Sequence, residues 1–220
     1  MEWIRNKIGL TSFQLKCIAI ISMVIDHTGA ILYPDEMIFR YIGRIAFPIF
    51  CFLLVEGFCH TGNVYRYMRR MLVFAFVSEI PYDLAFQGRI LEFGHQNVFF
   101  TLFLGVILMW ALQRAGEWPE KAAEIVLVMW IAGILKTDYS YTGILLIAVF
   151  YLLRDGLWIK LAAGTAWCFI WNGFVQKYGA LAMIPVALYN GERGRSMKYF
   201  FYAFYPLHLL ILYGISRWMI

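Results

Sequence analysis

The chain has 220 residues, of which 62% are hydrophobic and only 15% are charged. Soluble domains average about 45–50% apolar and about 25% charged residues, so this composition excludes an ordinary soluble enzyme. A net charge of +5 would suggest nucleic-acid binding in a soluble protein, but here the basic residues lie in short connections between apolar runs. There they orient a membrane protein, and we expect no nucleic-acid partner.

Nine apolar runs follow one another along the sequence and predict an all-α bundle of about nine transmembrane helices in a single domain over 1–220. A helix needs about 20 residues to cross a bilayer, so two of the runs, 141–153 and 178–189, are short enough to be broken or re-entrant helices. The runs cover residues 13–33, 41–59, 68–86, 97–113, 122–136, 141–153, 157–172, 178–189 and 198–217.

The basic residues predict the orientation of this bundle. With nine spans, twelve Lys and Arg residues, beginning with Arg5 and Lys7, fall on the side of the N-terminus and five fall on the opposite side. Basic connections stay in the cytoplasm, so we expect a cytoplasmic N-terminus and an outer C-terminus. The first run contains Lys16 and no small-residue cleavage site follows it, which favours a retained helix over a secretion signal.

Ionisable side chains inside membrane spans are costly and mark functional sites. The first helix carries His27 about 20 Å beyond its start, past the membrane centre. Other spans bring ionisable groups to a similar depth, so we expect one polar site in the outer half of the membrane, with Lys16 and Glu56 nearer the cytoplasm. The candidates are Lys16, Asp26, His27, Arg44, Glu56, Glu79, Asp83 and His208.

Helix geometry predicts that Asp26 and His27, which are neighbours in the first run, point in different directions. Lys16 and His27 are eleven residues apart, so at about 100° per residue they share one stripe, about 16 Å apart along the axis. Asp26 points about 100° away, and a carboxylate from another helix, such as Glu79, is the better partner for the imidazole. A histidine supported in this way can take a proton from an attacking amine or hydroxyl, and Arg44 can hold a carboxylate or a developing oxyanion.

Each of these residues also has a structural interpretation. An intramembrane histidine can be a helix–helix hydrogen-bonding group, which we favour for His208, and Arg44 can form a structural ion pair. Asp83 and Arg40 can be hydrated interfacial groups. The basic connection before the third run either orients the protein or binds phosphate groups; its arginines are Arg66, Arg69 and Arg70. The four cysteines form no CxxC motif, and we expect no metal site.

Six sequence blocks, in order along most of the chain, resemble the TraX family, which is named for a conjugation protein associated with N-terminal acetylation of pilin. The blocks are "LKCIAIISMVIDH" (15–27), "GRIAFPIFCFLLVEGFCHTGNVYRYMRR" (43–70), "SEIPYDLAF" (78–86), "HQNVFFTLFLG" (95–105), "KTDYSYTGILLI" (136–147) and "FYAFYPLHLLILY" (201–213). Three polar residues in these blocks are expected substrate contacts: Asn97, Thr101 and Asp138.

The sequence is more loosely similar to the acyltransferase family 3 membrane proteins. Their first helix carries a basic residue, ten intervening positions and a catalytic histidine, as Lys16 and His27 do here, although that family usually has Arg at the first position. The resemblance implies a multi-pass acyltransferase of the bacterial inner (cytoplasmic) membrane, with acetyl-CoA as donor and His27 as general base. The acceptor would be a peptide, glycan or lipid reached from the membrane or the outer face.

Two other functions remain open from the residues alone. Intramembrane histidines and carboxylates also build proton relays, so a small proton-coupled transporter is the main alternative. The other is a non-catalytic membrane subunit that assembles with partners. A transporter would move solute without an acyl donor. A non-catalytic subunit would tolerate neutral replacement of His27 and Glu79.

Overall fold

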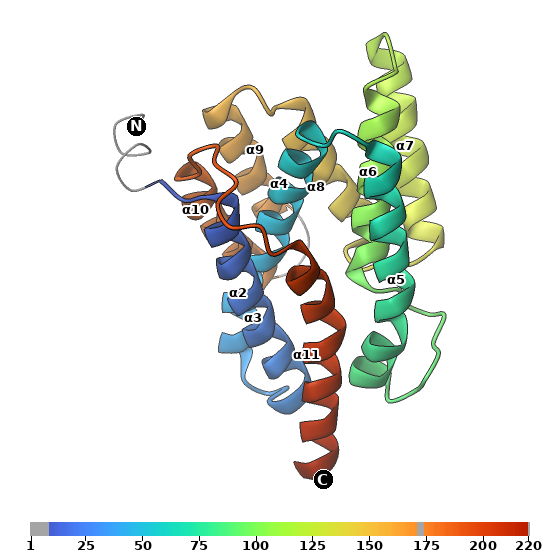
Figure 1. Cartoon of the computed structure of the whole chain (residues 1–220), viewed down its shortest axis with the longest axis vertical. Coiled ribbons are helices and arrows are strands. Elements are labelled where there is room, and N and C mark those ends of the chain that lie inside the picture. The colour runs from blue at the N-terminus through green and yellow to red at the C-terminus, as the bar shows by residue number, and fades with distance from the viewer. Residues whose placement is uncertain (1–8, 171–173, 220) are drawn as a thin grey trace. The chain divides into compact units, whose positions relative to one another are not determined.

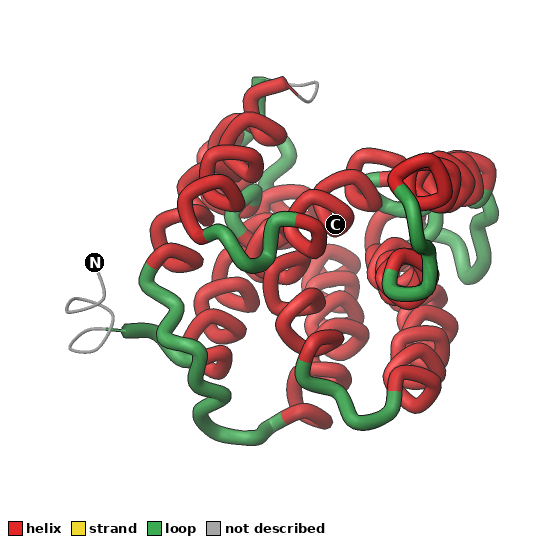
Figure 2. Tube along the Cα trace, turned by 90° about the horizontal axis from the view of Figure 1, so that it is seen from above, coloured by secondary structure: helices red, strands yellow, loops and turns green. Residues whose placement is uncertain are grey.

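The computed structural model describes residues 9–170 and 174–219, so Arg5 and Lys7, which enter the charge argument, lie outside the described residues. The described chain consists of helices joined by loops, as Figure 2 shows, and its only β-type pairings are isolated bridges between Leu10 and Tyr189 and between Gln96 and Thr137. The predicted all-α fold is confirmed for this part of the chain.

The helices follow the predicted apolar runs closely (Figure 1). Run 41–59 is divided between two helices, and run 178–189 is a 3₁₀ helix followed by one short α-helix, whereas run 141–153 is one uninterrupted helix. The elements are α2 (Ser12–Leu32), α3 (Met37–Gly43), α4 (Ala46–Cys59), α5 (Val64–Gln87), α6 (Val98–Leu112), α7 (Trp118–Ile134), α8 (Ser140–Leu152), α9 (Leu157–Ile170), η1 (Gln176–Ala182), α10 (Met183–Ala187) and α11 (Lys198–Met219).

Three of the described helical segments are long and apolar enough to cross a membrane. They are Ser12–Leu32, Met37–Cys59 taken across the turn between α3 and α4, and Tyr199–Met219. Shorter apolar helices are α6, α8 and α9. The apolar helices agree with a membrane protein, while the count of nine spans and the cytoplasmic N-terminus stay predictions.

The chain divides into two compact units. The first unit comprises residues 1–53 and 155–220, and the second comprises residues 54–154. In the first unit α2 packs against α3 and α11, and α9 packs against η1 and α10. In the second unit α6 packs against α5, α7 and α8. The single domain over 1–220 stays a prediction.

The start of α2 is fixed by capping and by backbone pairing within the first unit. Thr11 and Gln14 form a capping box, in which the Thr11 hydroxyl accepts the Gln14 N–H at 3.3 Å and the Gln14 side-chain oxygen accepts the Thr11 N–H at 2.8 Å. The Ser12 N–H donates to the carbonyl of Glu192 at 2.8 Å. Because these bonds satisfy N–H groups that the helix itself leaves open, α2 begins at a defined place beside the connection to α11.

The break between α3 and α4 lies at Arg44 and Ile45 and has a local cause. Pro48 has no N–H with which to bond the carbonyl of Arg44, so the helical ladder is interrupted there. The Ser22 hydroxyl of α2 donates to the carbonyls of Ile42 and Gly43 at the end of α3. The turn is thereby held against α2, which brings the arginine side chains of this segment toward that helix.

Gly43 makes the close approach of α3 to α2 possible. A Cβ atom at this position would overlap the side chain of Asp26. We expect Gly43→Ala to destabilise the protein by about 1–3 kcal/mol, because the ion-paired Asp26 side chain cannot move aside without losing its partners. Thermal unfolding in detergent measures this. In the control Gly214→Ala nothing lies within 4 Å of the new Cβ, and an equal loss in both variants would contradict the packing argument.

Candidate functional site

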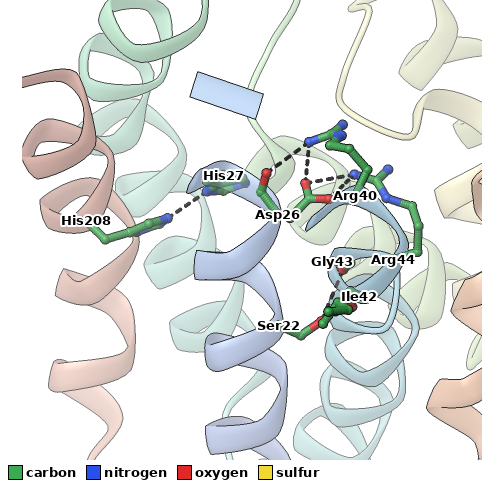
Figure 3. Close-up of polar contacts among 8 residues, drawn as sticks. All are labelled: Ser22, Asp26, His27, Arg40, Ile42, Gly43, Arg44 and His208. Carbon is green, nitrogen blue, oxygen red and sulfur yellow. Dashed lines mark hydrogen bonds and ion pairs between the residues drawn. The ribbon is translucent and has the colours of Figure 1, made fainter. Parts of the chain in front are cut away.

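Two faces of α2 carry different polar contacts, and Figure 3 shows them on opposite sides of the helix. Ser22 and Asp26, four residues apart, face α3 and the turn after it. His27 faces α11 and contacts His208. Lys16 also faces α11, with its Nζ 5.6 Å from the ring centroid of Phe201. The shared stripe of Lys16 and His27 and the divergence of Asp26 therefore agree with the helical geometry.

His27 and His208 form a hydrogen-bonded histidine pair. His27 Nδ1 lies 2.7 Å from His208 Nε2, and the rings are nearly parallel, 8° apart in orientation with centroids separated by 4.9 Å. The partner that the structure gives to His27 Nδ1 is thus a second imidazole, and the predicted pairing of His27 with Glu79 stays a prediction. Glu79 belongs to the second unit.

The hydrogen bonds of the pair assign its tautomers. His208 Nδ1 lies 2.9 Å from the carbonyl oxygen of Phe204, one turn earlier in α11. A carbonyl can only accept, so Nδ1 of His208 carries its proton, and in the neutral ring Nε2 is the acceptor. His27 must then donate from Nδ1, which leaves the lone pair of neutral His27 on Nε2. This is the nitrogen with which His27 can take up a proton.

Aromatic side chains of α11 hold His208 in this position. The ring of Phe204 stacks on it with centroids 5.2 Å apart, and Tyr205 contacts both His208 at 5.6 Å and His27 at 6.0 Å, edge to face. His208 and Tyr205 are both buried. A histidine with a bonded Nδ1 and two packed neighbours has little freedom to rotate, so the orientation of His27 is set by α11.

On the other side of α2, Asp26 lies between two arginines. Its carboxylate accepts from Arg40 Nη1 at 2.7 Å and from Arg44 Nη2 at 2.6 and 2.8 Å. Arg40 Nη1 also donates to the Asp26 carbonyl at 3.3 Å. We call Asp26, Arg40 and Arg44 the Asp26 cluster. The cluster ties the end of α2 to α3. Its Asp26 directly precedes His27 of the histidine pair in the sequence.

The other predicted site residues on α5 and α6 lie in the second unit, where they bond backbone groups and, for Glu79, also the side chain of Asn97. Glu79 Oε2 accepts from the backbone N–H of Asn97 at 3.3 Å and from its side-chain amide. The amide also donates to the Ala75 carbonyl at 2.8 Å, and Asn97 caps α6 through the N–H of Phe99. The Asp83 carboxylate accepts the Glu92 N–H at 2.8 Å. These contacts fasten the connection between α5 and α6.

Three further residues that were predicted to contact substrates belong to the second unit and lie near helix ends or in a connection. They are Thr101, Asp138 and Glu56. The Thr101 hydroxyl donates to the Asp138 carbonyl, and the Asp138 carboxylate accepts the N–H of Tyr139 at 3.0 Å. Glu56 is half-buried in α4, and its carbonyl accepts from the His60 ring at 2.8 Å. Their role in substrate binding stays a prediction.

The three arginines of the predicted phosphate patch are in the first turns of α5. Arg66 and Arg69 are exposed, and Arg70 is half-buried with its guanidinium carbon 5.5 Å from the ring centroid of Tyr67. Like the residues above they belong to the second unit. In the described part of the chain, no three His, Cys, Asp or Glu side chains are grouped so as to hold a metal ion.

Comparison with known proteins adds an independent line of evidence. The family model described as "TraX protein" matches residues 12–216 of this chain. The chain belongs to the TraX family. The match runs from the start of α2 into α11, so this TraX sequence includes the helices that carry both the histidine pair and the Asp26 cluster.

Relatives of this TraX chain include proteins with and without a described role. It is 29% identical over 236 residues to a probable fimbrial assembly protein FimC, serogroup H1, of Dichelobacter nodosus, covering 94% of this chain and 96% of that one. It is 27% identical over 140 residues to Protein TraX of Escherichia coli K12, covering 61% of this chain and 53% of that one. An uncharacterised Rickettsia prowazekii protein is 34% identical over 97 residues, 43% of this chain and 36% of that one. This chain thus spans nearly all of the fimbrial relative but about half of the E. coli protein. No solved structure matches it.

Sequence reasoning missed two contacts in this TraX chain. It gave Arg40 the role of an interfacial group, whereas Arg40 is bound to Asp26. The short connection of residues 33–36 between α2 and α3 was a usable signal, because helices joined so closely place the end of one beside the start of the next. The pairing of His27 with His208 carries no local signal, since 181 positions separate the two residues.

Proposed function

We propose that this TraX family protein is an acetyltransferase of the bacterial inner membrane that uses acetyl-CoA as donor and His27 as general base. The observation that carries the proposal is the histidine pair, in which the bond from His27 Nδ1 to His208 leaves the lone pair of His27 on Nε2. A histidine oriented by a second group is the arrangement that general-base catalysis requires.

In the proposed reaction, a neutral amine or a hydroxyl of the acceptor forms a bond to the thioester carbonyl carbon while its proton passes to His27 Nε2. The carbon–sulfur bond then breaks and its electron pair leaves with the sulfur. The proton moves from His27 to this sulfur, so the products are the acetylated acceptor and free CoA. Arg44, which is bound to Asp26 on the opposite side of α2, stays a predicted source of positive charge for the oxyanion of the intermediate and acts on it at a distance.

The donor is proposed to approach from the Lys16 end of α2. Lys16 lies on the same face of the helix as His27, and both contact α11. The spacing of these two residues is also the basis of the looser resemblance to acyltransferase family 3. A lysine provides one compact charge where an arginine would provide a bidentate fork, so Lys16 suits a phosphate or a polar group of the donor. Acetyl-CoA needs no metal in this scheme.

The acceptor is proposed to be a peptide, in particular a subunit of a surface filament. The relative matched over nearly its whole length is named a probable fimbrial assembly protein, and the family resemblance implies acetylation of a pilin N-terminus. Glu79 stays a predicted catalytic residue. The residues that stay predicted contacts of the substrates are Asp83, Asn97, Thr101, Asp138, Glu56 and the three arginines of α5.

A proton-coupled carrier is the alternative, since two hydrogen-bonded histidines can also pass a proton. Reconstituted vesicles distinguish the two functions. An acetyltransferase releases the free thiol of CoA from acetyl-CoA only when an acceptor peptide is present, and each released thiol matches one acetylated peptide. A carrier moves solute or protons across the vesicle membrane without any acyl donor, and this result with no thiol release would contradict the proposal.

The role of His208 as a positioning residue gives a separate prediction. His208→Leu should lower the rate of acetyl transfer by about 10-fold to 100-fold, because His27 remains but its tautomer and orientation are no longer fixed. In His208→Gln the side-chain oxygen can still accept from His27 Nδ1, so part of the rate should return. Equal rates in the two variants would show that the hydrogen bond has no role.

A further inference from the structure

The Asp26 cluster places two guanidinium groups on one carboxylate. Its three side chains together carry one negative and two positive charges, in a setting where the side chain of Asp26 is 9% exposed and that of Arg44 is 15% exposed. Charges that are largely removed from water interact more strongly than surface charges, so an excess of positive charge attracts a further anion.

Arg40 is the member of the cluster that a ligand can reach. Its side chain is 31% exposed, about twice as much as that of Arg44. Within the described residues its hydrogen bonds are donated by Nη1 alone, to the carboxylate and the carbonyl of Asp26. Nη2 and Nε therefore keep N–H groups for a second acceptor. Asp35 and Glu36, the acids just before α3, form no ion pair with Arg40 among these residues.

The position of the cluster relative to the base favours an anion on the acceptor. Asp26 and His27 are consecutive residues of α2, with Cα atoms about 3.8 Å apart, and their side chains leave the helix on opposite sides. When His27 takes up a proton, its new positive charge is repelled by Arg40 and Arg44. An anionic group bound at Arg40 cancels that repulsion at the moment of proton transfer. On the predicted topology this end of α2 faces outward, away from the Lys16 end assigned to the donor.

We propose that Arg40 binds a carboxylate of the acceptor, so that the acceptor is a peptide with an Asp or Glu side chain close to its reactive amine. The inference rests on the proposed function for the reaction, but not for the binding. A carboxylate brings one negative charge, which matches the single excess positive charge of the cluster. A phosphate group brings about 1.5–2 negative charges and would leave the site overcompensated.

Binding of three short peptides to the purified protein in detergent, without donor, tests the inference. The peptides differ at one position near a free N-terminus, which holds Glu, Gln or phosphoserine. We expect the Glu peptide to bind about tenfold more tightly than the Gln peptide, as a charge-assisted hydrogen bond is lost with Gln. Arg40→Gln should remove this preference, so that the Glu and Gln peptides bind equally, while the exposed control Arg217→Gln should keep the preference.

The outcomes separate the inference from the proposed function. Equal binding of the Glu and Gln peptides, or a preference that survives Arg40→Gln, overturns the carboxylate site. Tightest binding of the phosphoserine peptide, lost in Arg40→Gln, overturns the assignment of a carboxylate in favour of phosphate. A monodisperse peak in size-exclusion chromatography shows that Arg40→Gln is folded. Adding acetyl-CoA to the same samples tests the reaction: tight binding without transfer contradicts the proposed function and leaves the carboxylate site standing.

Discussion

Replacing His27 by alanine should lower the rate of acetyl transfer from acetyl-CoA by about 10²-fold to 10⁴-fold, the usual contribution of a general base. The expected loss is in the rate at saturating substrate, because the imidazole acts on the proton that moves in the transition state and not on the bound ground state. Single-turnover transfer to an acceptor peptide, with protein in excess over donor, measures this chemical step directly.

His60→Ala is the matched control for His27→Ala. His60 is an exposed histidine at the end of α4, and its ring nitrogen Nδ1 bonds the carbonyl of Glu56 in the same helical turn. We expect His60→Ala to transfer acetyl groups at the wild-type rate. If His27→Ala keeps the wild-type rate too, His27 is a helix-packing residue and the general-base assignment is wrong.

Asp26→Ala should lower the stability of the folded protein by about 3 kcal/mol. The substitution removes the carboxylate that the two guanidinium groups share, and it leaves positive charges close together in a largely buried place. It also detaches the end of α2 from α3. Thermal unfolding in detergent, followed by loss of the monodisperse peak in size-exclusion chromatography, should show a clearly lower midpoint temperature.

Asp35→Ala controls for the loss of a carboxylate in the same part of the chain. Asp35 is exposed in the connection between α2 and α3 and forms no ion pair among the described residues. We expect its unfolding midpoint to stay within about one degree of the wild type, because isolated surface charges contribute little. Equal midpoints for Asp26→Ala and Asp35→Ala would show that the Asp26 cluster does not stabilise the fold.

Most helices could be predicted because apolar runs and their boundaries are local properties of the chain. Thr11 with Gln14 and Asn97 before α6 are recognisable helix starts, and both cap helices in the structure. The division of run 41–59 was missed, although Pro48 removes an N–H from the ladder four residues after Arg44. The apolar character continues through the break, so composition gives no sign of it.

The site could be predicted only where helix geometry alone determines it. Lys16 and His27 share a face because eleven residues make about three turns, whatever the neighbouring helices do. The partner of His27 depends on how α11 docks on α2, and depth in the membrane is too coarse to choose between His208 and Glu79. Asp26 was correctly separated from His27, but its two arginines follow from the turn between α3 and α4.

The fate of the acetyl group tests the central claim most directly. Purified wild-type protein in vesicles is incubated with acetyl-CoA carrying an isotopically labelled acetyl group and with an acceptor peptide that has a free N-terminus and a nearby Glu. Mass spectrometry of the peptide should show one labelled acetyl group in the wild type and almost none with His27→Ala. Peptide that stays unlabelled with the wild type, or is labelled equally with both proteins, would contradict a histidine-dependent acetyltransferase.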